Sequence, residues 1–184
     1  KWYDKGLKKY PKDFFILQTK ALLCRILKQY DESIKCYDAI LEKKPHDLWI
    51  FNGKALILCD MGKYTESLDL YEIIRSTDSK EDSPPEEMIL NNIGWTWIQS
   101  GDYEKGLDFV EQALKIDSTK ASSIDSKAVA LKNLGRFKEA KEWYEKKFEI
   151  TKNEEDKMEI GICQRRMGLG SDEDLKHGSS IEAI

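Results

Sequence analysis

Four aromatic residues recur along the chain at nearly constant intervals, and each stands in a near-copy of one phrase. Tyr30, Tyr64, Tyr103 and Phe137 are separated by 34, 39 and 34 residues, and their phrases are LKQYDESIKCY, MGKYTESLDLY, SGDYEKGLDFV and LGRFKEAKEWY. In each phrase a small residue follows the ring by three positions, and a large apolar residue follows four positions later. Self-similarity at this period predicts a repeat array, whose units bury their apolar faces against their neighbours.

Apolar residues recur at helical spacing from residue 13 to residue 168, and short turns interrupt them every 12–16 residues. Glycine stands in three of the predicted tight turns, whereas Lys28 takes its place in the first, so that turn is expected to differ slightly. The predicted divisions are a half repeat at 1–10, full repeats at 13–44, 47–78, 86–117 and 120–151, a capping helix at 154–167 and a tail at 168–184.

This pattern resembles the tetratricopeptide repeat family over roughly residues 1–167. The residues that match the family's small eighth position are Ala21, Ala55, Gly94 and Ala128. The rings match its seventeenth position, and only the final proline of the pattern is replaced in two copies, by Ser79 and Ser118. The resemblance implies an all-α fold in which antiparallel helix pairs stack into a right-handed superhelix. The first helix of each pair would line a concave groove.

The resemblance also implies which positions of the first helices face that groove, and the charged residues at those positions are Arg25, Asp60, Asp125 and Lys132. In the second and third repeats those positions supply amide and large apolar side chains, which suit the backbone and the side chains of an extended peptide. The predicted peptide-binding residues are Trp49, Asn52, Leu56, Met88, Asn91, Asn92, Trp95 and Gln99. For Met88 and Trp95, burial beneath neighbouring helices is the open alternative.

Other aromatic residues at packing positions are assigned to the core, namely Tyr37, Tyr71, Trp97 and Trp143. Chaperone-binding members of the family grip a terminal carboxylate with basic residues at set positions of three repeats. This chain has no lysine or arginine at the corresponding positions, so carboxylate capture of that kind is disfavoured.

The charge of the chain is unevenly distributed. Its net charge is −4, which gives no support to binding of nucleic acid or an anionic membrane. Residues 46–118, however, hold 6 Lys/Arg against 15 Asp/Glu, a balance of −9. Ordinary solvation of helical surfaces explains such a balance, and the functional alternative is an acidic middle that favours a basic protein partner.

No motif for catalysis, metal binding or a cofactor is found. The four cysteines form no CxxC pair, and the two histidines, His46 and His177, stand far apart in a predicted turn and the tail. No apolar run approaches the length of a membrane span, and no signal peptide opens the chain. We therefore expect a cytoplasmic protein without catalytic activity, cofactor or metal.

The leading hypothesis is a protein–protein interaction scaffold that binds an extended peptide or a partner helix. Its first rival is a structural role in a longer repeat protein, with self-association through the half repeat at 1–10, whose exposed face lacks a preceding helix. A regulatory domain of a larger enzyme is the other alternative. A strictly monomeric chain that still binds a peptide would exclude the assembly role.

Overall fold

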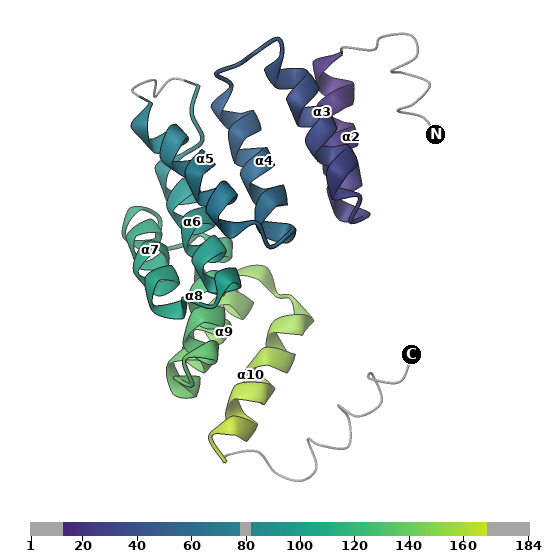
Figure 1. Cartoon of the computed structure of the whole chain (residues 1–184). Helices are drawn as coiled ribbons and strands as arrows, with labels where there is room; N and C mark the ends of the chain where they lie inside the picture. Colours follow the sequence, from purple (N-terminus) through teal and green to yellow (C-terminus); the bar gives the residue numbers. More distant parts are fainter. Residues whose placement is uncertain (1–12, 78–81, 169–184) are drawn as a thin grey trace. The chain divides into compact units, whose positions relative to one another are not determined.

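The structure is a computed structural model that describes residues 13–77 and 82–168. Over these residues the chain forms nine α-helices and no strand, which confirms the predicted all-α fold of stacked helix pairs (Figure 1). The predicted half repeat at 1–10 and nearly all of the predicted tail lie outside the described residues. The chain divides into two compact units, residues 1–85 and 86–184, and each is described by itself.

The first unit contains two helix pairs. Its helices are α2 (Phe14–Ile26), α3 (Tyr30–Leu41), α4 (Leu48–Asp60) and α5 (Tyr64–Ser76). Within each pair the two helices pack against each other, and α3 also packs against α4. We call the first helix of a pair its A helix and the second its B helix, so α2 and α4 are the A helices of this unit.

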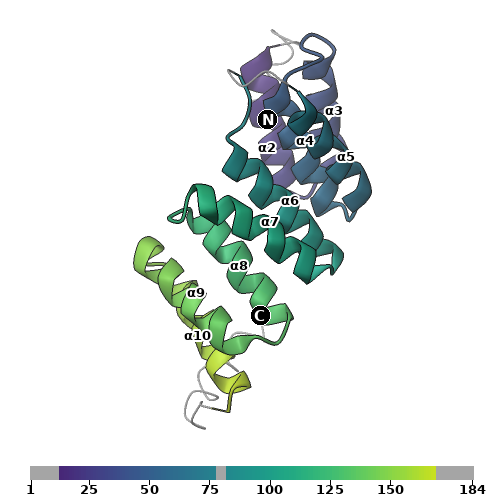
Figure 2. The same ribbon diagram turned by 90° about the vertical axis from the view of Figure 1, so that its left-hand side faces the viewer.

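The second unit contains two further pairs and a single last helix. Its helices are α6 (Glu86–Ser100), α7 (Tyr103–Ile116), α8 (Ala121–Asn133), α9 (Phe137–Thr151) and α10 (Glu154–Arg166). Each B helix packs on the helix that follows it, and the two A helices, α6 and α8, also contact each other (Figure 2). The second helix of every pair begins at one of the four recurring rings.

The turns within the pairs share one backbone conformation. Gly62, Gly101 and Gly135 have φ values of 76°, 94° and 76°, and Lys28 has a φ of 57°. In all four turns the amide of the next residue also bonds a carbonyl five residues earlier, as in the bond from Gln29 N to Cys24 O at 2.8 Å. This is the common left-handed helix ending, which costs least strain when the residue is glycine. The expected difference at Lys28 is therefore wrong, and the lysine adopts the same turn despite its side chain.

The A and B helices approach most closely where the pattern places its small residues. A methyl group at Gly94 would lie 2.6 Å from Val110 Cγ2 and 2.8 Å from the carbonyl oxygen of Gly106. One at Gly106 would lie 2.5 Å from Ile98 Cγ1 and 2.8 Å from the carbonyl oxygen of Gly94. The backbones of α6 and α7 therefore touch at a pair of glycines, which no larger residue can replace without moving a helix.

In the first unit the same contact is made by alanine and serine. Ser33 Oγ donates a hydrogen bond to the Ala21 carbonyl oxygen at 2.5 Å, and Ser67 Oγ donates one to the Ala55 carbonyl oxygen at 2.8 Å. All four residues are fully buried. The small residue of the B helix, here serine, thus gives the buried alanine carbonyl an additional hydrogen bond. A buried acceptor without enough partners would lower the stability of the fold.

The core of the first unit depends on one further close contact, between α3 and α4. Tyr37 is buried in a cluster with Leu17, Ile40 and Ile50. Its hydroxyl lies 2.6 Å from the point that a methyl group at Gly53 would occupy. Gly53 therefore makes room for the Tyr37 ring.

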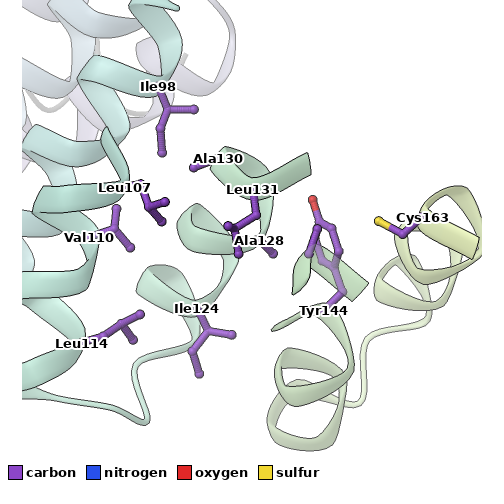
Figure 3. Packing of buried hydrophobic residues seen from close by; sticks show 11 residues of the cluster. Ile98, Leu107, Val110, Leu114, Ile124, Ala128, Ala130, Leu131, Tyr144 and Cys163 are labelled. Atoms are coloured by element: carbon purple, nitrogen blue, oxygen red, sulfur yellow. The ribbon is translucent and has the colours of Figure 1, made fainter. Parts of the chain in front are cut away.

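The core of the second unit runs through all five of its helices. Tyr144 of α9 lies between Ala128 and Leu131 of α8 on one side and Cys163 of α10 on the other (Figure 3). Burial raises the pKa of the Tyr144 hydroxyl, mainly through desolvation. Ala128, Tyr144 and Cys163 are almost completely buried. This contact joins the last helix to the repeat before it.

Two of the four aromatic residues assigned to the core are not fully buried. Tyr37 and Tyr71 are buried as predicted, but Trp97 and Trp143 are half-buried. Lysine ammonium groups lie over both indole rings, with Lys105 Nζ 4.5 Å from the centre of Trp97 and Lys127 Nζ 4.5 Å from the centre of Trp143. The lysines shield ring faces that the core does not cover, an arrangement favoured by cation–π attraction.

A buried charge network fixes α10 against α9. Asp156 is buried and accepts hydrogen bonds from Thr151 Oγ1 at 2.8 Å and from Lys147 Nζ at 2.8 Å. Lys147 also bonds Asp125 of α8 at 2.7 Å. Burial works against the charge of Lys147, but its hydrogen bonds to the two aspartates outweigh that effect and raise its pKa. Three helices are thereby linked through one ammonium group.

The glycine contact generates the first prediction. Gly94→Ala should lower the free energy of unfolding by about 1–3 kcal/mol, because the new methyl group meets the backbone of α7. Gly161→Ala in α10 is the matched control, because only Arg165 Nη1 lies within 4 Å of its added methyl group, at 3.8 Å. The free energy of unfolding of the control should rise by roughly 0.5–1 kcal/mol, because alanine favours the helix more than glycine does. Urea unfolding measures both, and a Gly94→Ala variant as stable as the parent would contradict the contact.

The charge network generates the second prediction. Lys147→Met should lower the free energy of unfolding by about 3 kcal/mol, because it leaves the buried Asp156 carboxylate without its cation. This is at the low end of the range for breaking a buried ion pair, because the Lys147 side chain is partly exposed to solvent. The double variant Lys147→Met/Asp156→Asn should lose less than the single one. Since the fold raises the pKa of Lys147, this stabilisation should persist through neutral pH and disappear only well above pH 10.5. Equal melting of the single variant and the parent would refute it.

Candidate functional site

The predicted binding residues of the first unit lie on one side of α4. Trp49, Asn52 and Leu56 are three and four residues apart, which places them on a single face of the helix. The Trp49 side chain is 44% exposed, Leu56 is half-buried, and Asn52 retains only 7% of its surface. This side of α4 therefore presents a flat aromatic ring and an aliphatic group, while most of the Asn52 amide is covered.

The predicted binding residues of the second unit lie on one side of α6. Their spacing again places all of them on one face of the helix, and they are Met88, Asn91, Asn92, Trp95 and Gln99. Gln99 is exposed, Asn91 keeps 7% of its surface, and the other three are half-buried. Trp95 also packs against the core cluster of this unit, so part of its ring is structural.

One amide on this face is unsatisfied. The carbonyl oxygen of Asn91 is buried, and no described residue donates a hydrogen bond to it. A buried acceptor without a partner costs about 1–3 kcal/mol, so such groups are rare in folded proteins. The hydroxyls of Ser123 and Tyr144 in the same unit are in the same state, but neither lies on the predicted binding face of α6. Asn52 has the same small exposure but does have an interaction partner. Of these two asparagines at equivalent positions, only Asn91 has a buried side-chain oxygen without a hydrogen-bond partner among the described residues.

Four charged residues at predicted groove positions, Arg25, Asp60, Asp125 and Lys132, are held in ion pairs. In the first unit Arg25 Nε lies 2.6 Å from an Asp60 carboxylate oxygen. In the second unit Lys132 Nζ lies 2.7 Å from Glu159, and Asp125 is bound by Lys147. Burial is the largest single effect on Arg25 and opposes its charge, but the hydrogen bond to Asp60 and the attraction of its carboxylate together outweigh burial and raise the pKa of Arg25. Each of these four charges therefore has an opposite charge beside it.

The cysteines and the acidic residues form no reactive arrangement over residues 13–77 and 82–168. All four cysteines are buried and form no disulfide. Burial raises the pKa of the Cys36 and Cys163 thiols, which makes these two poor nucleophiles. The described residues contain no group of three metal-ligating side chains, and none of their helices is long and apolar enough to cross a membrane.

Comparison with known proteins identifies the repeat. Sequence profiles described as tetratricopeptide repeat match residues 47–119 and, in a second form, residues 16–47 and 121–154. A comparison with curated protein sequences gives no significant match.

Several solved structures share the fold at low sequence identity. PilW, described as a type IV pilus biogenesis factor, has a TM-score of 0.77 at 16% identity over 91% of this chain and 76% of its own. MamA has a TM-score of 0.62 at 17% identity over 90% of this chain and 88% of its own. The first repeat domain of Spaghetti (RPAP3), bound to the HSP90 peptide SRMEEVD, has a TM-score of 0.58 at 17% identity over 66% and 96%.

The profile matches together cover well over half of the chain, and each of the four helix pairs falls within them. The described helices, the turns and the small-residue contacts all follow the same repeat. The chain therefore belongs to the tetratricopeptide repeat family.

Proposed function

We propose that this protein is an interaction scaffold that holds an extended peptide on the exposed faces of its A helices, with the Asn91 amide as the central hydrogen-bonding group. The main observation behind this proposal is that the buried side-chain oxygen of Asn91 has no hydrogen-bond donor among the described residues. Retaining such a group lowers stability, so its presence requires an explanation. A backbone N–H of a bound peptide is the donor that would satisfy it.

The neighbours of Asn91 on α6 suit the rest of such a peptide. Trp95 is one helical turn further along and is half-buried, so its free edge can contact an apolar side chain while its other part stays in the core. Gln99 is exposed and can donate and accept a hydrogen bond. In the first unit, Trp49 and Leu56 offer the same kind of apolar anchor.

Binding of peptides by related folds supports this proposal. The Spaghetti (RPAP3) domain was solved with an HSP90 peptide, and YrrB is described as having an unusual peptide-binding site. YrrB has a TM-score of 0.55 at 14% identity over 92% of this chain and 85% of its own. At sequence identities this low, the comparison supports a shared fold and says nothing about which residues of this chain bind a ligand. The residues of the proposed site are therefore argued from this chain's own geometry.

The hypothesis of a basic partner must rest on residues outside the predicted groove. The two acids at groove positions in the sequence, Asp60 and Asp125, are both held in ion pairs. We therefore propose that the remaining acidic surface speeds the approach of a basic protein without forming its central contacts. Exposed charge acts in this way on association rates more than on final affinity.

The third prediction tests the Asn91 amide with peptides selected from a random 12-residue display library on the full chain. Asn91→Leu should raise the free energy of unfolding by about 1 kcal/mol, because it removes a buried unpaired acceptor. The same variant should bind the selected peptide about tenfold more weakly, since the peptide N–H then loses its acceptor. Urea unfolding and fluorescence polarisation measure the two effects.

Asn52→Leu is the matched control for stability. It is as buried as Asn91 but already has a partner, so its substitution should destabilise the fold. If no peptide is enriched on the parent chain, or if Asn91→Leu changes neither stability nor affinity, the proposed function fails.

The fourth prediction concerns salt. Between 0.05 and 0.5 M NaCl the affinity for an uncharged selected peptide should change by less than about twofold, because the groove charges are paired. The additional affinity of the same peptide with flanking lysines should disappear, because charges are screened over about 10 Å at 0.1 M salt. A tenfold loss for the uncharged peptide would contradict the pairing of groove charges.

A further inference from the structure

A cavity of about 490 Å³ lies beside the turn that joins α3 to α4. It is lined by residues 44–49, which form the end of this turn and the start of α4, and by Thr77 and Asp82. The turn joins the first helix pair to the second (Figure 1). All of the lining residues belong to the first unit. Pockets that bind small ligands have volumes of about 300–1,000 Å³, so this cavity can hold a ligand group.

Aromatic rings form part of the cavity wall. The Trp49 side chain borders the cavity and is 44% exposed, so its indole ring is open to a ligand. The imidazole of His46 also borders the cavity and is exposed. Among aromatic side chains, indole attracts cations most strongly, and a planar guanidinium can also stack on it. This part of the wall therefore suits a cation.

The charged groups of the lining leave one carboxylate without a partner. Lys44 Nζ lies 4.0 Å from an Asp47 carboxylate oxygen and 4.6 Å from the centre of the Phe14 ring. These two lining charges therefore offset each other. Asp82 is exposed, and none of the residues that the structure describes forms a hydrogen bond or an ion pair with its carboxylate. A cationic ligand in the cavity would supply the missing partner.

The start of α4 does not turn the cavity into an anion site. Free N–H groups at the start of a helix attract anions. Here, however, the Asp47 side chain already accepts a hydrogen bond from the Ile50 N–H at 3.2 Å. An anion in the cavity would also meet the carboxylate of Asp82, whereas the ammonium of Lys44 is already engaged. Both features disfavour a carboxylate or phosphate ligand and favour a cation.

We propose that this cavity binds an arginine side chain of the protein partner. The guanidinium stacks on the Trp49 indole and donates two parallel hydrogen bonds to the Asp82 carboxylate, as arginine commonly does with carboxylates. A lysine ammonium forms the ion pair without the planar stack or the paired hydrogen bonds, so arginine is preferred. This inference rests on the proposed function and deepens it, because it names a side chain of the bound peptide.

Three short peptides test the ligand class on the full chain. The probe is an acetylated and amidated tripeptide with arginine between two alanines. In the first comparison peptide citrulline, a neutral group of nearly the same shape, replaces arginine, and in the second lysine replaces it. Nuclear magnetic resonance follows the indole N–H of Trp49, assigned by its loss in Trp49→Phe.

The arginine probe should shift the Trp49 signal to saturation with a dissociation constant in the millimolar range. The citrulline peptide should bind at least about tenfold more weakly, because it has no charge to pair with Asp82. The lysine peptide should bind about threefold more weakly, because it loses the stack. The absence of a shift with the arginine probe, or equal binding of the arginine and citrulline peptides, would overturn the inference.

Variants of the chain locate the contact, with backbone signals of residues 44–47 as the readout. Asp82→Asn should weaken the arginine probe about tenfold, and Trp49→Leu about threefold. The matched control is Asp69→Asn on α5, because Asp69 is exposed in the same unit, lacks a partner among the described residues and does not line the cavity. It should bind the probe as the parent does. Equal losses in Asp82→Asn and Asp69→Asn would indicate general attraction to acidic surface and overturn the inference.

Two further outcomes separate this inference from its alternatives. Tighter binding of inorganic phosphate than of the arginine probe, seen at the same Trp49 signal, would identify an anion site and overturn the inference. The tripeptides are too short to test the extended-backbone role of Asn91, so the two proposals fail separately. Failure of the arginine probe together with the expected loss of the selected peptide in Asn91→Leu would refute only this inference. Saturable binding of the probe without any selected peptide would refute only the proposed function.

Discussion

The close contact between the two helices of each pair is the constraint on which the structure depends. At Gly94 and Gly106 the backbones of α6 and α7 leave no space for a single methyl group. In the first unit, Ser33 and Ser67 use the same proximity to bond a carbonyl of the A helix. A pair that closes this tightly buries one side of its A helix and fixes which side remains for a partner. The recurring small residues thus determine the surface as well as the core.

The remaining side of the A helix differs in chemistry between α6 and α2. On α6 it carries amides, including the Asn91 oxygen that no described residue satisfies, whereas on α2 it carries the exposed apolar residues Phe15, Leu22 and Ile26. Around both surfaces the charged residues Arg25, Asp60, Asp125 and Lys132 are held in ion pairs. Binding is therefore expected to depend on shape, apolar contact and backbone hydrogen bonds. This agrees with the absence of a basic cluster at the positions that grip a terminal carboxylate in related proteins.

The fold could be predicted from the sequence because the same pattern of aromatic and small residues occurs four times. One local signal is the aromatic residue at the start of each B helix, and the other is the small residue where the two helices of a pair meet. The structure confirms both positions. The left-handed turn at Lys28 was not predictable, because the tertiary contact of α2 with α3 imposes it on a residue that disfavours it. The close approach of Tyr37 to Gly53 was not predictable either, because Tyr37 belongs to another helix. Nor was the half-burial of Trp97 and Trp143, because lysines cover part of their rings.

The position of the predicted binding residues on single helix faces followed from spacing alone, but their burial did not. Exposure of Asn91 or Trp95 depends on side chains from several helices, which no repeat template contains. The most direct test is nuclear magnetic resonance of the full chain during titration with a selected peptide, observing the side-chain amide of Asn91 and the indole N–H of Trp95. The account predicts that both signals shift with the bound fraction, while backbone signals around Ile116 on the B helix α7 do not. Shifts confined to B-helix residues would contradict it.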